Sequence, residues 1–141
     1  MSKRIFIDTS AWIEIILKGE KYSREVTDYF VSQLEAGSKF FTNDYVLDEA
    51  WTRLTTQQSF FSAKALRTKT RQAERLGKLA IVWTDEVLFN RAWETFAKFS
   101  EHKLSFTDSL IITVAKDFRV DEILTLDQGF KKAGLTVRPI L

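Results

Sequence analysis

The chain has 141 residues and contains 45% apolar and 13% aromatic residues, which suits a single packed domain over residues 1–141 and excludes intrinsic disorder. It has no cysteine, and this excludes disulfides, zinc–thiolate sites and thiol nucleophiles. The net charge of +2 indicates no particular partner by itself.

Short apolar runs that end at polar residues alternate with longer amphipathic stretches along the chain. The runs predict buried strands at Arg4–Asp8, Lys39–Thr42, Leu79–Trp83, Glu122–Leu126 and Thr136–Arg138. The alternation is typical of an α/β fold, so we expect a mostly parallel sheet of four to five strands flanked by helices.

The stretches between these runs carry apolar residues at helical spacing and predict helices. They begin or end at capping residues or glycines and cover Thr9 to a stop at Gly19, Ser23–Ala36, Asn43 through Leu54, a basic helix ending near Gly77, Asp85–Ser100, Phe106–Phe118 and Gln128–Ala133. The inward face of the second helix includes Val31, and the apolar face of the fifth includes Val87 and Trp93.

Four acidic residues fall where ligands gather in such sheets, at the carboxyl ends of the strands. Asp8 and Asp127 directly follow predicted strands, Glu49 lies on the helix after the second strand, and Asp108 lies in the first turn of its helix. Crowded carboxylates repel one another and raise each other's pKa, so a bound cation stabilises them. Oxygen ligands of this kind suit Mg²⁺ or Mn²⁺.

Each carboxylate also has an ordinary structural role open to it. Asp8 and Asp127 are placed to cap the helices that follow them, and Asp108 is placed to complete a capping box with the serine three residues earlier. Glu49 lies four residues before Arg53, a spacing that suits a surface ion pair. Singly, the residues leave both roles open, but four acids at one predicted edge favour a metal site.

Four ordered segments carry a resemblance to a known family. They are Ile5–Trp12 (IFIDTSAW), Tyr45–Trp51 (YVLDEAW), Leu104–Ile111 (LSFTDSLI) and Ile123–Phe130 (ILTLDQGF). With a closing Ala133–Val137, they resemble the PIN-domain family, most closely its stand-alone VapC-like toxin nucleases. The resemblance covers essentially the whole chain.

The resemblance implies a metal pocket of Asp8, Glu49, Asp108 and Asp127. It implies that hydroxyl side chains support the carboxylates or a bound water, and these are Thr9, Ser10 and Thr125. An auxiliary role for Asp44 or Asp48 stays open, although helical rotation favours Glu49.

The implied activity is that of a Mg²⁺- or Mn²⁺-dependent endoribonuclease that hydrolyses RNA with activated water. In this reading Asp8, Glu49 and Asp108 hold the principal metal, and Asp127 shapes a second or outer position. Toxins of this type form homodimers and are silenced by a small antitoxin protein whose tail enters the acidic groove. Apolar residues of the early helices are candidates for an interface or for the core, namely Trp12, Ile16, Tyr29 and Phe30.

A run of basic residues in the fourth predicted helix is a candidate track for RNA phosphates. It comprises Lys64, Arg67, Lys69, Arg71, Arg75 and Lys78, against one acid, Glu74. A solvated helix face is the alternative reading of the same charges.

Two functional alternatives keep the same fold. One is a housekeeping RNA-processing PIN nuclease, and the other is a non-catalytic RNA- or protein-binding module. No run of about 18 apolar residues predicts a membrane span, and Asp8 and Glu14 interrupt any signal-like N-terminal segment. We expect a cytoplasmic protein without membrane contact.

Overall fold

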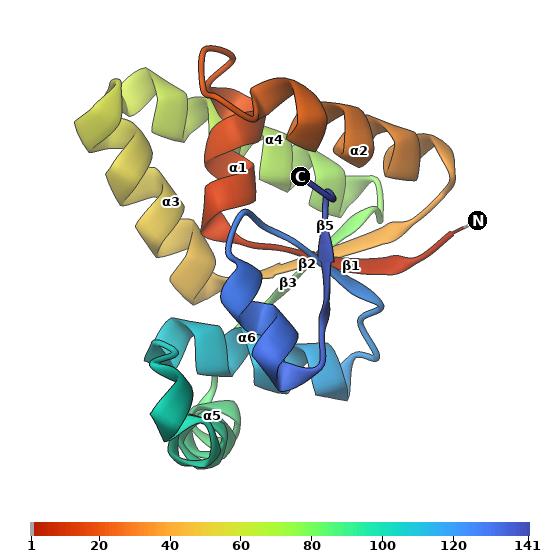
Figure 1. The fold of residues 1–141 in the computed structure, drawn as a ribbon. Coiled ribbons are helices and arrows are strands. Elements are labelled where there is room, and N and C mark those ends of the chain that lie inside the picture. The colour runs from red at the N-terminus through yellow and green to blue at the C-terminus, as the bar shows by residue number, and fades with distance from the viewer. Residues whose placement is uncertain (1) are drawn as a thin grey trace.

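A five-stranded sheet runs through the middle of the molecule in the computed structural model, which describes residues 2–141 (Figure 1). The strands are β1 (Arg4–Ile7), β2 (Lys39–Asn43), β3 (Leu79–Val82), β4 (Glu122–Leu124) and β5 (Thr136–Arg138). Their order is β3-β2-β1-β4-β5 and every neighbouring pair is parallel. The predicted parallel α/β fold is confirmed.

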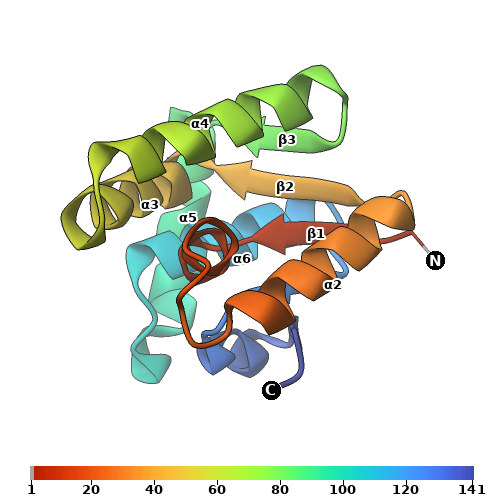
Figure 2. The same cartoon turned by 90° about the horizontal axis from the view of Figure 1, so that it is seen from above.

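Helices cover both faces of this sheet. They are α1 (Thr9–Ile16), α2 (Ser23–Glu35), α3 (Asp44–Gln57), α4 (Phe60–Arg75), α5 (Glu86–Lys98) and α6 (Phe106–Asp117), with two 3₁₀ turns, η1 (Ser100–His102) and η2 (Gln128–Ala133). Helices α1 to α4 lie on one side of the sheet, and α5 and α6 lie on the other (Figure 1). Viewed from above, β1, β2 and β3 all point to the left, toward the edge where α1 and α3 begin (Figure 2).

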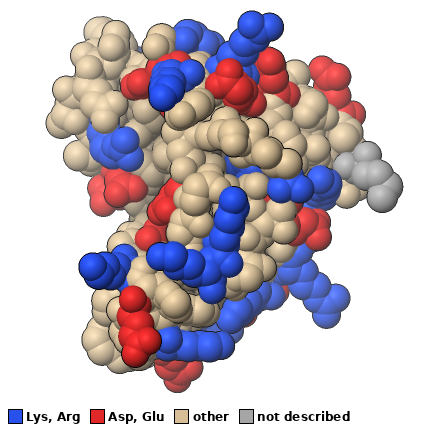
Figure 3. Space-filling model, in the orientation of Figure 1, with Lys and Arg blue, Asp and Glu red and all other residues tan. Residues whose placement is uncertain are grey.

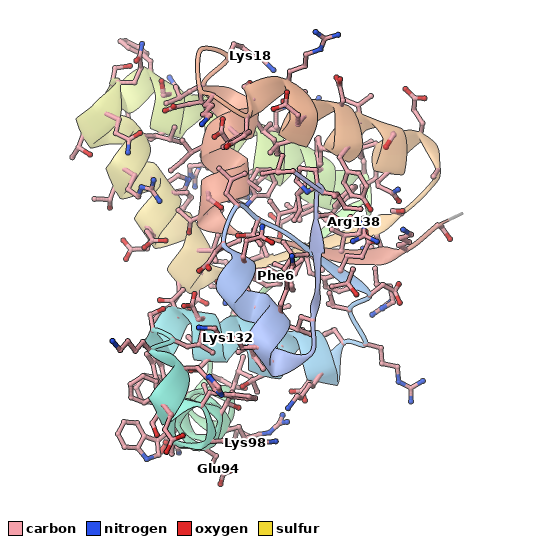
Figure 4. All side chains as sticks on the ribbon, viewed as in Figure 1. Phe6, Lys18, Glu94, Lys98, Lys132 and Arg138 are labelled. Carbon is pink, nitrogen blue, oxygen red and sulfur yellow. The ribbon has the colours of Figure 1, made fainter. Side chains whose placement is uncertain are left out.

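The central strand β1 is buried on both faces, because a parallel sheet is covered by helices on each side. Ile5, Phe6 and Ile7 have no exposed surface, which accounts for their continuous apolar run. Phe6 lies in the interior of the molecule (Figure 4). The early helices complete this core, since Trp12 packs edge-on against Phe30 with ring centroids 6.3 Å apart.

Side-chain caps fix where the helices begin. Asn43 ends β2 and accepts a 2.8 Å hydrogen bond from the amide of Val46, which confirms its predicted role as the N-cap of α3. Asp85 caps α5 in the same way, through the amide of Leu88. A carboxylate or amide at this position satisfies an amide that the helix leaves without a partner.

Three strands end earlier than the sequence predicts. β1 ends at Ile7, one residue before its predicted end, and Asp8 instead caps α1. β3 ends at Val82, which is paired with Asn43, the last residue of β2, so Trp83 has no neighbouring strand to pair with. β4 ends at Leu124, paired with Ile7, the last residue of β1. β3 and β4 therefore end level with the last residues of β2 and β1, their more central neighbours in the sheet.

The exposed face of α5 differs from the prediction. Val87 and Trp93 are 68% and 60% exposed, although the sequence pattern placed them on the apolar face. The helix packs mainly against α6 at the periphery of the molecule, where its Glu94 and Lys98 also lie (Figure 4). Most of its circumference therefore faces solvent. Val31 of α2, predicted to face inward, is also exposed.

Crossing a membrane would need a helix longer and more apolar than any in residues 2–141.

Candidate active site

A cavity of about 240 Å³ lies at the carboxyl edge of the sheet. It is lined by Asp8, Thr9, Ser10, Glu49, Arg53, Ser105, Thr107, Asp108 and Asp127. The four carboxylates singled out from the sequence thus come together from the ends of β1 and β4 and from the helices α3 and α6. In Figure 3, acidic side chains lie in the hollow on the left, between the helices drawn above and below the sheet in Figure 1.

Asp8 forms the buried inner wall of the cavity and is only 8% exposed. Its Oδ1 accepts a 2.7 Å hydrogen bond from the amide of Thr9, and its Oδ2 accepts a 2.8 Å hydrogen bond from the hydroxyl of Thr125. The pKa of Asp8 is raised to about 6, mainly by burial and to a smaller extent by the charges of Asp108 and Glu49, against the lowering effect of the hydrogen bonds from Thr125 and Thr9. The carboxylate is therefore held in one orientation at an electrostatic cost.

Asp108 and Asp127 each use one carboxylate oxygen to cap a helix. Asp108 closes the predicted capping box, because the amide of Ser105 donates to its Oδ2 and its own amide donates to the Ser105 hydroxyl. Asp127 caps η2 through a 2.8 Å hydrogen bond from the amide of Gly129 to its Oδ1. Within residues 2–141 no hydrogen bond uses the second oxygen of either side chain, so capping leaves a free acceptor on each.

The pKa of Asp108 is also raised. Burial is the main cause, and the negative charges of Asp127 and Glu49 add to it, while the hydrogen bonds from Ser105 act in the opposite direction. Mutual repulsion among carboxylates that share a small cavity is what a bound cation would relieve.

Glu49 is the only acid at the start of α3 that lines the cavity, within the described residues. Asp44 instead accepts hydrogen bonds from the amide and hydroxyl of Thr84, over 3.2 and 2.7 Å, and so joins α3 to the end of β3. Asp48 points to solvent. The ion pair expected between Glu49 and Arg53 is absent from residues 2–141, and both side chains line the cavity separately.

Hydroxyl groups connect the carboxylates behind the cavity. The hydroxyl of Thr125 donates to Asp8 and accepts from the amide of Asp127 at 3.0 Å. The hydroxyl of Ser10 lies 3.2 Å from that of Thr125 and accepts from the amide of Leu126. The predicted supporting positions of Ser10 and Thr125 therefore have a physical basis in these contacts.

Thr9 differs from the other two hydroxyl residues. It supports Asp8 through its backbone amide, while its own hydroxyl is buried and has no hydrogen-bond partner among residues 2–141.

The sequence of the chain matches a known protein family. The profile of the PIN domain matches residues 5–135. The chain belongs to the PIN-domain family.

Solved structures with the same fold include VapC20, which is described as a toxin, and structures of VapBC2 and FitAcB. The Mycobacterium tuberculosis toxin VapC20, described as cleaving the sarcin–ricin loop, has a TM-score of 0.81 and 26% identity, over 96% of this chain and 99% of that one. VapBC2 from Rickettsia felis, bound to a promoter DNA fragment, has a TM-score of 0.68 and 14% identity, over 96% and 97% of the two chains. FitAcB from Neisseria gonorrhoeae has a TM-score of 0.65 and 18% identity, over 96% of each chain. No curated protein sequence matches this chain significantly.

The donor set of this PIN domain fits a hydrated divalent cation. No three carboxylate or imidazole side chains in residues 2–141 converge closely enough to form a complete metal site by themselves. The carboxylates instead surround a cavity with room for water. Mg²⁺ usually keeps several waters and takes only a few carboxylate ligands, so an open site of this kind suits it better than a closed one.

The six basic residues predicted as an RNA track all lie exposed on α4 or directly after it. None of them lines the cavity. Lys78 directly precedes β3 and so lies at the amino edge of the sheet, opposite the carboxylates. Arg71 is 3.8 Å from Glu74, and the track remains a prediction for a surface separate from the cavity.

Sequence reasoning missed three further residues of the site. Arg53 and Ser105 were interpreted only as partners of Glu49 and Asp108, and Thr107 was not singled out, yet all three line the cavity. The signal for Arg53 was available, because a residue four positions after Glu49 lies on the same face of the helix.

Proposed function

We propose that this PIN domain is a metal-dependent endoribonuclease and the toxin of a toxin–antitoxin pair. The observation that carries the proposal is the convergence of Asp8, Glu49, Asp108 and Asp127 on one cavity from four distant chain segments. Burial, with a smaller contribution from the neighbouring carboxylates, raises the pKa of Asp8 and Asp108, and the ionised carboxylates therefore destabilise the metal-free protein at neutral pH. A purely structural role would not explain why the protein keeps carboxylates whose burial destabilises it.

In this proposal Asp8, Glu49 and Asp108 hold the ion, and Asp127 shapes an outer position. A bound Mg²⁺ or Mn²⁺ ion would supply Lewis-acid activation of water and of the phosphodiester. Thr125 and the amide of Thr9 keep the Asp8 carboxylate in place during the reaction. The free oxygen of Asp127 would accept a hydrogen bond from the attacking water and orient it toward phosphorus.

The partners proposed are an RNA substrate, a second copy of the chain and a small antitoxin protein. VapC20, which shares the fold at 26% identity, is described as a toxin, which supports the last of these. Trp12 and Phe30 are buried in the core, so they do not form an interface. The exposed apolar side chains of α5, chiefly Val87 and Trp93, are the surface we propose for the second copy.

RNA cleavage tests the nuclease directly. Because VapC20 is described as cleaving the sarcin–ricin loop, total ribosomal RNA, which contains that loop, is the first substrate. We expect the wild type to cut it with Mg²⁺ or Mn²⁺ and not with EDTA, and we expect Asp8→Asn to cut it under neither condition. Equal cleavage by both proteins would contradict the proposal.

Growth experiments separate a toxin from a housekeeping enzyme or a binding module. We expect expression of the wild type alone to arrest growth, Asp8→Asn to have no effect, and co-expression of an adjacent small gene to restore growth. A metal-dependent nuclease that leaves growth unchanged would be an RNA-processing enzyme instead.

A further inference from the structure

Arg53 is the single cationic side chain among the residues that line the acidic cavity, within residues 2–141. It lies on α3, one turn beyond Glu49, and its side chain is exposed. In the described part of the chain its guanidinium forms no ion pair and no hydrogen bond, whereas its backbone carbonyl accepts from Thr56. A charged group with five donors is therefore free at the mouth of the cavity.

A role in neutralising the carboxylates does not explain this placement. An arginine kept for that purpose would pair with a carboxylate, and the spacing from Glu49 allows such a pair. The two side chains line the same cavity without pairing. The donors of Arg53 thus stay available for a ligand that the protein itself does not supply.

The residues that line the cavity differ in their exposure to solvent. Asp8, on the inner wall, is buried, while Arg53 is exposed. A polyanion that approaches the cavity is repelled by its four carboxylates and attracted by Arg53. The planar guanidinium matches the geometry of a phosphate group and binds it through two parallel hydrogen bonds.

We infer that Arg53 is a substrate-binding residue that holds a backbone phosphate of the RNA at the mouth of the cavity. The inference rests on the proposed nuclease function. Arg53 would position the strand so that the neighbouring phosphodiester reaches the carboxylates. It would act separately from the basic residues of α4, since none of those lines the cavity.

The test compares the wild type with Arg53→Ala, Arg53→Lys and the control Arg24→Ala. Arg24 is an exposed arginine on α2, paired with Asp28 and absent from the cavity. The initial rate of ribosomal RNA cleavage in Mn²⁺, at low RNA concentration and over a series of salt concentrations, gives kcat/KM and its salt dependence. The rise in melting temperature on adding Mn²⁺ is measured on each protein without RNA.

We expect Arg53→Ala to lower kcat/KM roughly tenfold, mainly through a higher KM. The slope of log kcat/KM against log salt should fall by about 0.7, the effect of one phosphate contact to a single strand. Arg53→Lys should keep the wild-type salt dependence, because the charge remains. It should recover only part of kcat/KM, because the lysine ammonium cannot form the two parallel hydrogen bonds of the planar guanidinium. Arg24→Ala should match the wild type, and the Mn²⁺-dependent rise in melting temperature should persist in Arg53→Ala.

Wild-type kinetics in Arg53→Ala would overturn the inference and leave the nuclease standing. Loss of the Mn²⁺-dependent rise in melting temperature in Arg53→Ala would also overturn it, since Arg53 would then support the carboxylates instead of the RNA. If Arg53→Ala does not fold, Arg53→Lys decides the question by its rate. A wild type that cleaves nothing in Mn²⁺ removes the proposed function, and this inference with it.

Discussion

The hydroxyl of Thr125 donates a 2.8 Å hydrogen bond to Oδ2 of Asp8 and so ties the end of β4 to the end of β1. The two residues are 117 positions apart in the chain and meet only because β1 and β4 are parallel neighbours. The contact lowers the pKa of Asp8, against the larger effect of burial. It therefore links the topology of the sheet to the charge state of the site.

Thr125→Val should raise the pKa of Asp8 above its present value of about 6, because it removes the strongest contact that lowers it. We expect the metal-dependent activity to need a higher pH and the protein to lose about 1–3 kcal/mol of stability, since Asp8 loses a buried partner. A pH–rate profile and urea unfolding measure the two effects.

The matched control is Thr42→Val. Thr42 is also fully buried, and its hydroxyl bridges Trp12 and the carbonyl of Ile7 away from the cavity. The Thr42→Val variant should lose about as much stability as Thr125→Val, and its pH–rate profile should match that of the wild type. An unchanged pH profile in Thr125→Val would show that the Thr125 contact does not control Asp8.

Asp8→Asn should stabilise the metal-free protein at neutral pH. The pKa of Asp8 is 3.8 in the unfolded chain and about 6 in the folded protein, so between these values the folded protein binds more protons. Its stability therefore falls as the pH rises through this window, by up to roughly 3 kcal/mol in all. Asn carries no charge and avoids that loss.

Thermal unfolding in EDTA, from pH 4 to pH 8, measures this difference. We expect the melting temperature of Asp8→Asn to exceed that of the wild type at pH 7, and the gap to close toward pH 4. Added Mn²⁺ should narrow the gap by stabilising only the wild type. A variant less stable than the wild type at every pH would mean that the hydrogen bonds of Asp8 outweigh its desolvation.

Substitutions in the capping box separate the structural role of Asp108 from its proposed role as a ligand. Ser105→Ala removes the hydroxyl that caps α6 and should cost about 1 kcal/mol of stability. It leaves the Asp108 carboxylate in place, so most of the metal-dependent activity should remain. Asp108→Asn keeps an oxygen for the amide of Ser105 but should abolish cleavage.

The comparison of these two variants needs unfolding curves and cleavage rates from the same preparations. Activity that follows stability in both variants would show that Asp108 acts only as a cap.

Trp93→Glu should convert a dimer into a monomer. Trp93 is 60% exposed and its ring lies tilted against that of Phe96, with centroids 5.6 Å apart, and a charge at this position would prevent an apolar interface. Light scattering should give about twice the chain mass of 16.4 kDa for the wild type and one chain mass for the variant. Phe61→Glu, on an aromatic of α4 that is 77% exposed, is the control and should stay dimeric. A monomeric wild type would contradict the proposed interface.

Much of this arrangement was accessible from the sequence, because its signals are local. The apolar run Ile5–Ile7 predicted a strand buried on both faces, and the acids after the strands predicted where a site would form. The capping roles of Asp8, Asp108 and Asp127, weighed as alternatives to a metal site, are confirmed. Because each cap leaves acceptor capacity on the carboxylate, capping and metal binding do not exclude one another.

The remaining features depend on tertiary contacts that no local pattern contains. Helical spacing identified the apolar residues of α5 but not which of them α6 would cover, so Val87 and Trp93 were misplaced. The ends of β3 and β4 are set by the lengths of β2 and β1. Whether Arg53 pairs with Glu49 depends on the shape of the cavity, which spacing along a helix does not determine.

Mn²⁺ titration of the purified protein, followed by calorimetry, tests the central claim most directly because it needs no knowledge of the RNA target. We expect saturable binding by the wild type and a loss of affinity of at least roughly tenfold in Asp8→Asn, as removal of one ionic ligand should cause. Asp48→Asn, which removes an exposed acid beside the site, should bind like the wild type. Absence of Mn²⁺ binding by the wild type, or equal binding by Asp8→Asn, would contradict the assignment of these carboxylates as a metal site.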